Sequence, residues 1–367
     1  MLIESVFNNK KVLITGHTGF KGSWLASWLN YLGADVSGIA LPPPSSPSLF
    51  DEAGITNEIL DIRLDVRNHE GLIKIVDELQ PDFVFHLAAQ SLVRKSYTDP
   101  IETWQTNVLG TLNLLDSLRK INEQCIAIIV TSDKCYDNVE WVWGYRENDR
   151  LGGPDPYSAS KGAAELAFNS YVKSFFQSPD NGVLIASARA GNVIGGGDWA
   201  KDRVVPDCIR AWSAGETVEL RNPKATRPWQ HVLEPLSGYL LLACHLSKNQ
   251  DIHGESYNFG PMDKDIKSVQ QLVEEMSRHW DKVNWRDIPA SSDGPYESNL
   301  LKLNCDKALM HLNWHAAMDF KETIRMTVEW YKEFYDADKK SQMKNITVAQ
   351  IVEYTNLAKA QGLLWAM

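Results

Sequence analysis

The chain has 367 residues, of which 44% are hydrophobic and 23% are charged, a composition typical of a globular protein with one large or two ordinary domains. Its formal net charge of −10 argues against general nucleic-acid binding, which needs a basic surface, but it leaves room for an anionic small ligand held by a few local cations. No apolar run approaches the roughly 20 residues of a membrane span.

The N-terminal sequence MLIESVFNNKKVLITG lacks the apolar core of a signal peptide and leads directly into a predicted strand. The five cysteines are odd in number, scattered and without a CxxC pair, which argues against a disulfide framework and a zinc site. The nine histidines are scattered along the chain, and we expect no metal. These features favour the reducing environment of the cytoplasm.

Six short apolar runs in the first half of the chain predict β-strands, and the amphipathic stretches between them predict helices. The strands are expected at 11–15, 35–40, 60–64, 82–87, 125–131 and 183–189, and the helices near 20–33, 68–80, 101–121 and 158–177. Alternation of strands and helices, with nearly continuous apolar strands, is typical of a parallel sheet that helices cover on both faces. The predicted fold class is therefore α/β with a doubly wound parallel sheet.

After about residue 190 the pattern loosens into turn-rich segments such as GNVIGGGDWAKD. Short strands are expected near 217–220 and 255–259, and helices near 234–247, 267–279, 320–335 and 345–364. This part predicts a smaller, irregular α/β lobe that binds the substrate. We expect a cofactor domain at 1–190 and a mainly substrate-binding domain at 191–367, with segments that cross between the lobes.

The sequence GHTGFKG follows the first predicted strand and places Gly16, Gly19 and Gly22 before the first helix. Glycines allow a tight turn and a close approach of the backbone to a pyrophosphate, which the N-terminus of the helix then binds. In this strand–turn–helix context the loop predicts a Rossmann-type dinucleotide site. The other loop residues expected at the cofactor are His17, Thr18, Phe20 and Lys21.

Segments that follow later strands fit the same dinucleotide by their order along the chain. An acidic residue about 20 positions past the glycines would select NAD, but that region reads IALPPPSSP, with no carboxylate before Asp51. His17 and Lys21 could instead favour a 2′-phosphate, so the residues alone leave NAD and NADP both open. The remaining residues expected at the cofactor are Asp65 and Val66 after the third strand, Leu87, Ala88 and Ala89 after the fourth, and Asn107 on the next helix.

Tyr157 and Lys161 form a YxxxK pattern in DPYSASK, at the predicted start of a helix. The i, i+4 spacing places both side chains on one helix face. A lysine ammonium near a phenol stabilises the phenolate and lowers the pKa of the tyrosine, which makes a base for a sugar alcohol. The preceding strand ends in VTSDKCYDN, which brings Ser132, Asp133 and Lys134 to the same edge of the sheet.

Five stretches together resemble the extended short-chain dehydrogenase/reductases and, within them, the nucleotide-sugar 4,6-dehydratases. They are GHTGFKGSWL, TSDKCYDN, DPYSASKGAAE, ARAGNVIGGGDW and RNPKATRPWQHVLEPL, and the similarity spans nearly the whole chain. The dTDP-glucose branch would have Asp-Glu where this chain has Asp133-Lys134, and the Asp-Lys form is similar to the CDP-glucose branch. The resemblance implies tightly bound NAD, CDP-glucose as the small-molecule substrate, and a homodimer or homotetramer built through the helices near 101–121 and 157–177.

The resemblance also implies a hydro-lyase reaction that ends in CDP-4-dehydro-6-deoxy-D-glucose. Tyr157 would deprotonate the C4 hydroxyl while hydride passes from C4 to the nicotinamide. A base would then remove the C5 proton, an acid would protonate the departing C6 hydroxyl, and the hydride would return to C6. Oxidation needs only Tyr157, Lys161 and a hydroxyl such as Ser132, whereas elimination needs an extra acid and base, the roles implied for Asp133 and Lys134.

The Asp133–Lys134 pair poses a question of charge, because a free lysine has a pKa of about 10.4. Burial and the like charge of Lys161 would lower the pKa of Lys134, whereas an ionised Asp133 would raise it. The sequence also leaves open that the two side chains share one proton.

The turn-rich lobe must bind the substrate diphosphate. Arg227 is the main candidate because a guanidinium forks onto phosphate, and Arg189 and Asn192 follow the sixth strand, where a substrate mouth is expected. The other residues expected at the substrate are Ser91, Arg94, Arg203 and Glu297.

Other functions stay open on the same scaffold. A dTDP-glucose or GDP-mannose 4,6-dehydratase would differ in substrate, and a 4-epimerase would not need the acid–base pair at 133–134. A cofactor-sensing protein without chemistry would have no need of the set Ser132, Tyr157 and Lys161.

Overall fold

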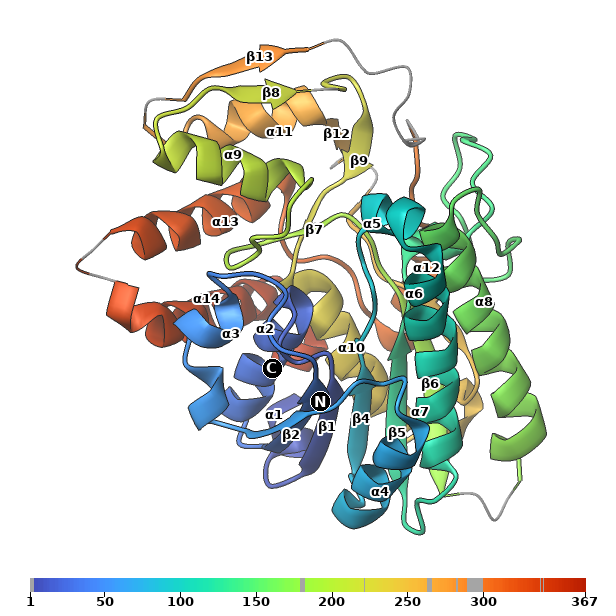
Figure 1. Ribbon diagram of the computed structural model, residues 1–367. Coiled ribbons are helices and arrows are strands. Elements are labelled where there is room, and N and C mark those ends of the chain that lie inside the picture. The colour runs from blue at the N-terminus through green and yellow to red at the C-terminus, as the bar shows by residue number, and fades with distance from the viewer. Residues whose placement is uncertain are drawn as a thin grey trace.

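A computed structural model describes the chain except residues 1–2, 179–181, 221, 263–265, 282, 289–299, 337 and 339. A parallel sheet in the strand order β11-β6-β5-β4-β1-β2-β3 forms its centre (Figure 1). The order reverses between β1 and β4, and ligands of such sheets bind where the strand order reverses, at the carboxyl ends of the strands. The strands are β1 Lys11–Thr15, β2 Asp35–Ala40, β3 Leu60–Arg63, β4 Phe83–His86, β5 Cys125–Val130, β6 Val183–Arg189 and β11 Ser256–Asn258.

Helices cover both faces of the sheet, as the apolar strands predict. Val12 and Ile14 of β1 face one core while Leu13 faces the other, because successive side chains of a strand point to opposite faces. The helices of one face are α2 (Phe20–Tyr31) and α10 (Leu233–Leu246), and those of the other are α4 (His69–Leu79), α7 (Gly110–Leu118) and α8 (Pro156–Tyr171).

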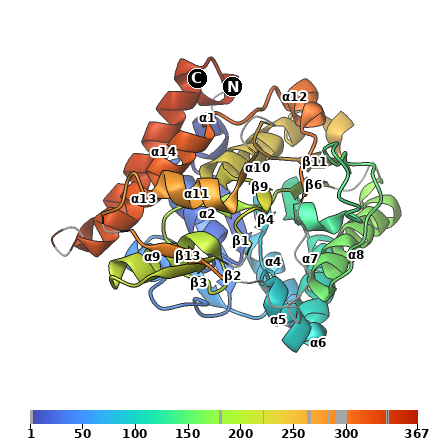
Figure 2. The same ribbon diagram turned by 90° about the horizontal axis from the view of Figure 1, so that it is seen from above.

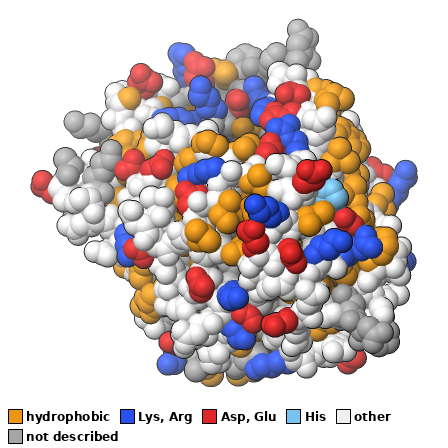
Figure 3. Space-filling view, turned by 60° about the horizontal axis from the view of Figure 1, so that its bottom comes forward, with side chains coloured by type: hydrophobic (Ala, Val, Ile, Leu, Met, Phe, Trp, Pro, Cys, Tyr) orange, Lys and Arg blue, Asp and Glu red, His pale blue; other side chains and the backbone are white. Residues whose placement is uncertain are grey.

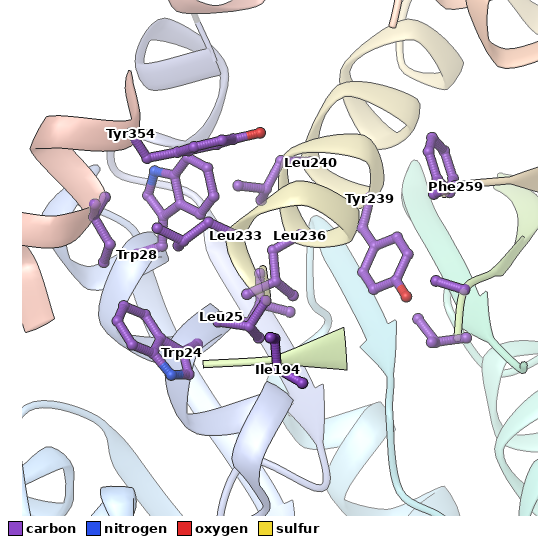
Figure 4. Close-up of a cluster of buried hydrophobic side chains, with 14 of the residues drawn as sticks. Trp24, Leu25, Trp28, Ile194, Leu233, Leu236, Tyr239, Leu240, Phe259 and Tyr354 are labelled. Carbon is purple, nitrogen blue, oxygen red and sulfur yellow. The ribbon is translucent and has the colours of Figure 1, made fainter. Parts of the chain in front are cut away.

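The core on the α2 side fixes the helix that follows the glycine loop. Side chains of α2 and α10 interdigitate there, and α14 (Met343–Ala360) adds an aromatic ring (Figure 4). Fully burying one such side chain stabilises the fold by about 1.5–3 kcal/mol, so α2 is held firmly against the sheet. The residues are Trp24, Leu25 and Trp28 from α2, Leu233, Leu236 and Leu240 from α10, and Tyr354 from α14.

The remaining elements form short connections and an upper lobe, which lies above the carboxyl ends of the strands in Figure 1 and in front of the sheet in Figure 2. The lobe pairs short strands in twos: β7 Val193–Ile194 with β10 Gln230–His231, β8 Val218–Leu220 with β13 Trp285–Asp287, and β9 Thr226–Pro228 with β12 Ile266–Ser268. The other helices are α1 Ile3–Phe7, α3 Leu49–Glu52, α5 Val93–Thr98, α6 Pro100–Trp104, α9 Val204–Ser213, α11 Val269–Met276, α12 Asp306–Leu312 and α13 Phe320–Tyr335.

The predicted α/β fold with its Rossmann-type parallel sheet is confirmed, and each of the six expected strands is present within one residue of its predicted ends. The segment expected as a lobe strand near 255–259 differs, because β11 pairs with Ser187, Ala188 and Arg189 and is the seventh strand of the main sheet. A three-residue strand so late in the chain carries no pattern that reveals its partner. The division of the chain near residue 190 stays a prediction.

The surface mixes both signs of charge. On the face shown in Figure 3, Lys and Arg side chains are interspersed with Asp and Glu, and neither sign gathers in a large patch. Within the part of the chain that the structure describes, no helix is both long enough and apolar enough to span a bilayer.

Candidate active site

The glycine loop lies between β1 and α2, and two of its glycines have a clear steric cause. Gly16 has a φ of +79°, and a Cβ there would stand 2.7 Å from the backbone nitrogen of Ala88. A Cβ on Gly22 would stand 2.1 Å from the carbonyl oxygen of Gly16. Only glycine allows these approaches. The N-terminus of α2 has no side-chain capping bond, and the first N–H groups of a helix have no partner within the helix. The residues therefore fit the diphosphate of a dinucleotide.

Burial weakens the positive charge that His17 and Lys21 could present to a ribose 2′-phosphate. The His17 ring is buried with its Nε2 2.9 Å from Asp61 Oδ1, and burial lowers the pKa of His17, so the ring is neutral at pH 7. The Lys21 amine lies 3.5 Å from the Tyr239 hydroxyl, and burial lowers its pKa to about 7, against the opposite effect of Asp133. The neutral His17 ring weighs against NADP. The carboxylate of Asp61 comes from β3, well beyond the segment about 20 positions past the glycines.

Two further residues expected at the cofactor are engaged within the chain. The carboxylate of Asp65 accepts hydrogen bonds from the Arg67 backbone and guanidinium at 2.9 and 2.6 Å. Asn107 is buried and ties the loop after β4 to α8, because its amide donates to the Gln90 carbonyl at 3.1 Å and to Ser160 Oγ at 2.9 Å. Asn107 therefore helps to position α8, which carries Tyr157 and Lys161, and its direct contact with a cofactor stays a prediction.

The other residues expected at the cofactor lie at the carboxyl edge of the sheet or in the loops that leave it. They are Thr18 and Phe20 in the glycine loop, Val66 after β3, and Leu87, Ala88 and Ala89 after β4. Their roles stay predictions.

The start of α8 places the YxxxK pair. Asp155 caps the helix by accepting from the Ser158 backbone N–H at 2.9 Å, and Pro156 occupies the first turn, where its missing N–H costs nothing. Tyr157 therefore stands in the first turn and Lys161 one turn later, and both side chains are buried.

The end of β5 brings a carboxylate beside this pair. Ser132 Oγ donates to Asp133 Oδ1 at 3.0 Å and accepts from the Lys134 backbone N–H at 3.2 Å. The amide of Asn192 donates to Asp133 Oδ2 at 3.1 Å. Gly191 gives the carboxylate its space, since a Cβ there would lie 2.0 Å from it. Asp133 is thus buried, fixed at both oxygens and held by a segment that follows β6.

Gly191→Ala is expected to displace the Asp133 carboxylate and to slow any reaction that uses it by about 10²-fold, the size of effect that a misplacement of 1 Å can have. The matched control is Gly260→Ala, since a Cβ there would meet nothing closer than 3.5 Å. Turnover of both variants checks this, with circular dichroism to confirm folding. Wild-type turnover of a folded Gly191→Ala protein would contradict the expectation.

The charge state of Tyr157 differs from the prediction. Burial raises the pKa of Tyr157 to about 12, and Asp133 adds to the increase, while a hydrogen bond with Ser132 and the charge of Arg203 lower it. The prediction that the pKa of Tyr157 is lowered is therefore wrong for the protein by itself, because burial determines the net direction. Burial destabilises the phenolate by more than the surrounding cations stabilise it.

Asp133 and Lys134 do not form an ion pair with each other, although they are neighbours in sequence. Within the described part of the chain, the Lys134 amine does not come within 4.0 Å of the Asp133 carboxylate. Asp133 bonds to Ser132 and Asn192 instead. The structure thus gives no support to a proton shared directly between them. Lys134 is partly exposed, whereas Asp133 is buried.

The residues expected at the substrate fall into separate groups. Arg203 donates to Asp198 Oδ2 at 2.8 Å and to Ser91 Oγ at 3.3 Å, and its charge acts on Tyr157. Arg94 lies 3.6 Å from Asp202. These contacts join the loops after β4 and β7 beside the catalytic pair.

The other candidates lie elsewhere. Arg227 is on β9, where its guanidinium donates to the Thr226 carbonyl at 2.8 Å, and Glu297 lies outside the described residues. Arg189, expected at the substrate mouth, is instead buried and pairs with Glu165 at 2.7 Å. A pattern of strand ends does not reveal which arginine turns inward.

A small pocket of about 10 Å³ lies beside Asp133 and Gly191, with Gln230 and Lys302 in its wall. Gln230 is buried, and its amide donates to the carbonyls of Gly191 and Phe259 at 2.9 and 3.1 Å. It thereby fixes the segment that holds Asp133. Sequence reasoning missed Gly191 and Gln230, because neither has a local pattern that points to Asp133.

Comparisons with known proteins agree with this geometry. Residues 13–327 match the family model described as GDP-mannose 4,6 dehydratase. The chain is 48% identical over 337 residues to a CDP-glucose 4,6-dehydratase of Salmonella typhimurium, covering 90% of this chain and 93% of that protein. It is 27% identical to a dTDP-glucose 4,6-dehydratase of Streptomyces antibioticus over 88% and 92% of the two chains. The fold matches a UDP-glucose-4-epimerase of Stenotrophomonas maltophila, solved with NAD, at a TM-score of 0.77 and 20% identity, covering 90% of this chain and 100% of that one.

Proposed function

The chain belongs to the GDP-mannose 4,6 dehydratase family of the extended short-chain dehydrogenase/reductases, and we propose that it converts CDP-D-glucose to CDP-4-dehydro-6-deoxy-D-glucose with NAD as its cofactor. The observation that carries the proposal is the position of Asp133, whose fixed carboxylate stands beside the Ser132–Tyr157 pair. One site thus brings together the groups for an oxidation and an acid for an elimination. The 48% identity to the Salmonella enzyme, over nine-tenths of the chain, supports CDP-glucose as the substrate.

Tyr157, Lys161 and Ser132 act in the oxidation. Tyr157 takes the proton of the C4 hydroxyl, Ser132 holds that hydroxyl through its own hydrogen bonds, and the Lys161 ammonium stabilises the phenolate. NAD, when bound, supplies the acceptor that takes hydride from C4 and later returns it to C6. Since the buried Tyr157 has a pKa of about 12 without ligands, its deprotonation must be coupled to substrate and cofactor binding.

Asp133 and Lys134 act in the elimination. The C4 ketone acidifies the C5 proton, Lys134 removes that proton, and Asp133 gives a proton to the C6 hydroxyl, which leaves as water. A proton then returns to C5 as hydride returns to C6. The balance is the loss of one water with no net oxidation. Asn192 supports this step by orienting the Asp133 carboxylate.

The substrate diphosphate is assigned to cations of the upper lobe. Arg203 stands near Tyr157 and is braced by Asp198, and Arg227 offers a second guanidinium on β9. Ser91, Arg94 and Glu297 complete the proposed substrate contacts.

We also propose a homo-oligomer, in which the exposed apolar side chains of two neighbouring helical segments meet a second copy. Five of them lie on α6 with its following π turn and on α8 with its following π turn, on the right of Figure 1. A homodimer or homotetramer and a cytoplasmic location stay predictions. The side chains are Ile101, Trp104, Leu109, Leu166 and Phe175.

The test is incubation of the purified protein and NAD with CDP-glucose, dTDP-glucose, UDP-glucose or GDP-mannose, followed by mass spectrometry. We expect loss of one water from CDP-glucose without net consumption of NAD. If only another of these sugar nucleotides lost water, that sugar nucleotide would be the substrate instead of CDP-glucose. Inversion at C4 without water loss would indicate an epimerase. No water loss from any of the four would end the dehydratase proposal.

A further inference from the structure

Glu165 is a buried carboxylate on the catalytic helix to which the reaction above assigns no role. It follows Lys161 by one helical turn, and i, i+4 residues share a helix face. Its side chain is fully buried. An ionised carboxylate in such a place needs several donors.

Four side chains donate to Glu165: Thr131 just after β5, Ser187 and Arg189 on β6, and Ser256 at the start of β11. Thr131 Oγ1 donates to its Oε1 at 2.5 Å. Arg189 Nη2, Ser187 Oγ and Ser256 Oγ donate to Oε2 at 2.7, 3.0 and 3.3 Å. Burial alone would raise the pKa of Glu165, but the Arg189 charge and these hydrogen bonds outweigh burial and hold the pKa below its usual value. Glu165 is therefore ionised and tied to β5, β6 and β11.

Arg189 extends the network to the loop that carries the proposed acid and base. Its Nη1 donates to the Tyr136 hydroxyl at 2.7 Å and to the Glu147 carbonyl at 2.9 Å. Tyr136 directly follows the turn Asp133–Cys135, and its hydroxyl donates to Asn258 at 2.7 Å. One ion pair thus joins the helix of Tyr157 and Lys161 to the segment of Asp133 and Lys134.

The buried Lys161 ammonium has a single nearby carboxylate among the groups that act on it. Burial lowers the pKa of Lys161 to about 8, and Glu165 is the first of the groups that oppose this, followed by the Cys135 thiol. Lys161 in turn acts as a like charge on Lys21 and on the buried His86.

We propose that Glu165 is a positioning residue that keeps Lys161 protonated and in register with Tyr157, an inference that rests on the role assigned to Lys161 in the proposed function. The charge of Glu165 offsets the burial of the ammonium, and its four donors fix the helix turn against the sheet. Removing that charge lowers the pH at which Lys161 loses its proton.

The experiment compares Glu165→Gln, which removes the charge and keeps the shape, with the double variant Glu165→Gln/Arg189→Met. The double variant leaves no unpaired buried arginine, and neutral replacements of a buried ion pair are usually tolerated. Titration of the isotope-labelled lysine ε-carbon follows Lys161 directly by NMR in the full chain, with its resonance identified by its loss in Lys161→Met. We expect the titration midpoint to fall by about one pH unit or more in both variants.

Ser187→Ala is the matched control, because it removes one donor to Glu165 and leaves the carboxylate charged; its midpoint should equal that of the wild type. The alkaline limb of the pH profile for NADH formation with CDP-glucose should move with the NMR midpoint.

The proposal would be overturned if Glu165→Gln kept the wild-type titration midpoint of Lys161. It would also be overturned if the midpoint returned to the wild-type value in the double variant, because the unpaired Arg189 or a folding defect would then explain the change in the single variant. A wild-type protein that forms no NADH would instead refute the proposed function, and the NMR titration would still decide the role of Glu165.

Discussion

Lys134→Ala is expected to stop dehydration while leaving the first oxidation at C4 intact. The proposed base for the C5 proton is removed, so turnover should fall by about 10²–10⁴-fold, the usual contribution of a positioned acid or base. Tyr157, Lys161 and Ser132 are untouched, and the truncation removes no partner of the Asp133 carboxylate, which bonds to Ser132 and Asn192. Rapid mixing of enzyme, NAD and CDP-glucose should show NADH absorbance that rises and persists, without water loss in the product mass.

The matched control is Lys173→Ala, which removes an exposed lysine just after α8 and should turn over at the wild-type rate. Deuterium at C5 gives a second readout, because Lys134→Ala should no longer exchange it with solvent. Loss of NADH formation with CDP-glucose still bound would assign Lys134 to the oxidation and remove it as the C5 base.

The sheet could be predicted from the sequence because a strand that is buried on both faces is apolar at nearly every position. Runs such as KVLIT and CIAIIV are apolar at every position or nearly so, and β5 is buried along its whole length. β11 shows no such pattern, because it has three residues and its pairing with β6 bridges the chain between Arg189 and Ser256. Helices whose packing is set by contacts with distant segments, such as α9 and α12, were not predicted either.

The site divides in the same way between local and distant partners. The YxxxK spacing and the order Ser132-Asp133-Lys134 are local, and the structure brings these segments together as expected. The bond from Asn192 to Asp133 joins residues 59 apart, and the sequence predicted Asn192 as a substrate ligand without revealing that bond. Arg189 and Glu165 are a similar pair, because the inward turn of the arginine follows from buried partners on β6 and β11.

The charge of Tyr157 shows where a motif is insufficient. The sequence correctly predicts a cation on the same helix face, but the sign of the pKa shift depends on burial, which a motif does not report. Burial dominates, and the pKa rises to about 12. The acid limb of the pH profile for C4 oxidation reports the pKa of Tyr157 in the complex. A midpoint well below pH 12 would mean that bound substrate and cofactor stabilise the phenolate.

Tyr157→Phe is expected to abolish both stages, in contrast to Lys134→Ala. Without the phenolic oxygen no side chain takes the C4 proton, so NADH formation and water loss should both fall by about 10²–10⁴-fold. The ring still fills its buried site, and the lost hydrogen bond with Ser132 should cost only about 0.5–1.5 kcal/mol of stability. CDP-glucose binding, measured by calorimetry, should be nearly unchanged, since the hydroxyl acts on the reacting atom.

The control for this variant is Tyr171→Phe on the same helix, which keeps the ring contact with Phe175 at 5.0 Å and should leave both rates unchanged. The two active-site variants then separate the half-reactions, because NADH accumulates in Lys134→Ala and fails to form in Tyr157→Phe. If Tyr157→Phe formed NADH at the wild-type rate, another group would be the C4 base. Lys21, whose pKa of about 7 and position near Asp133 permit it to accept a proton, would be the first residue to replace next.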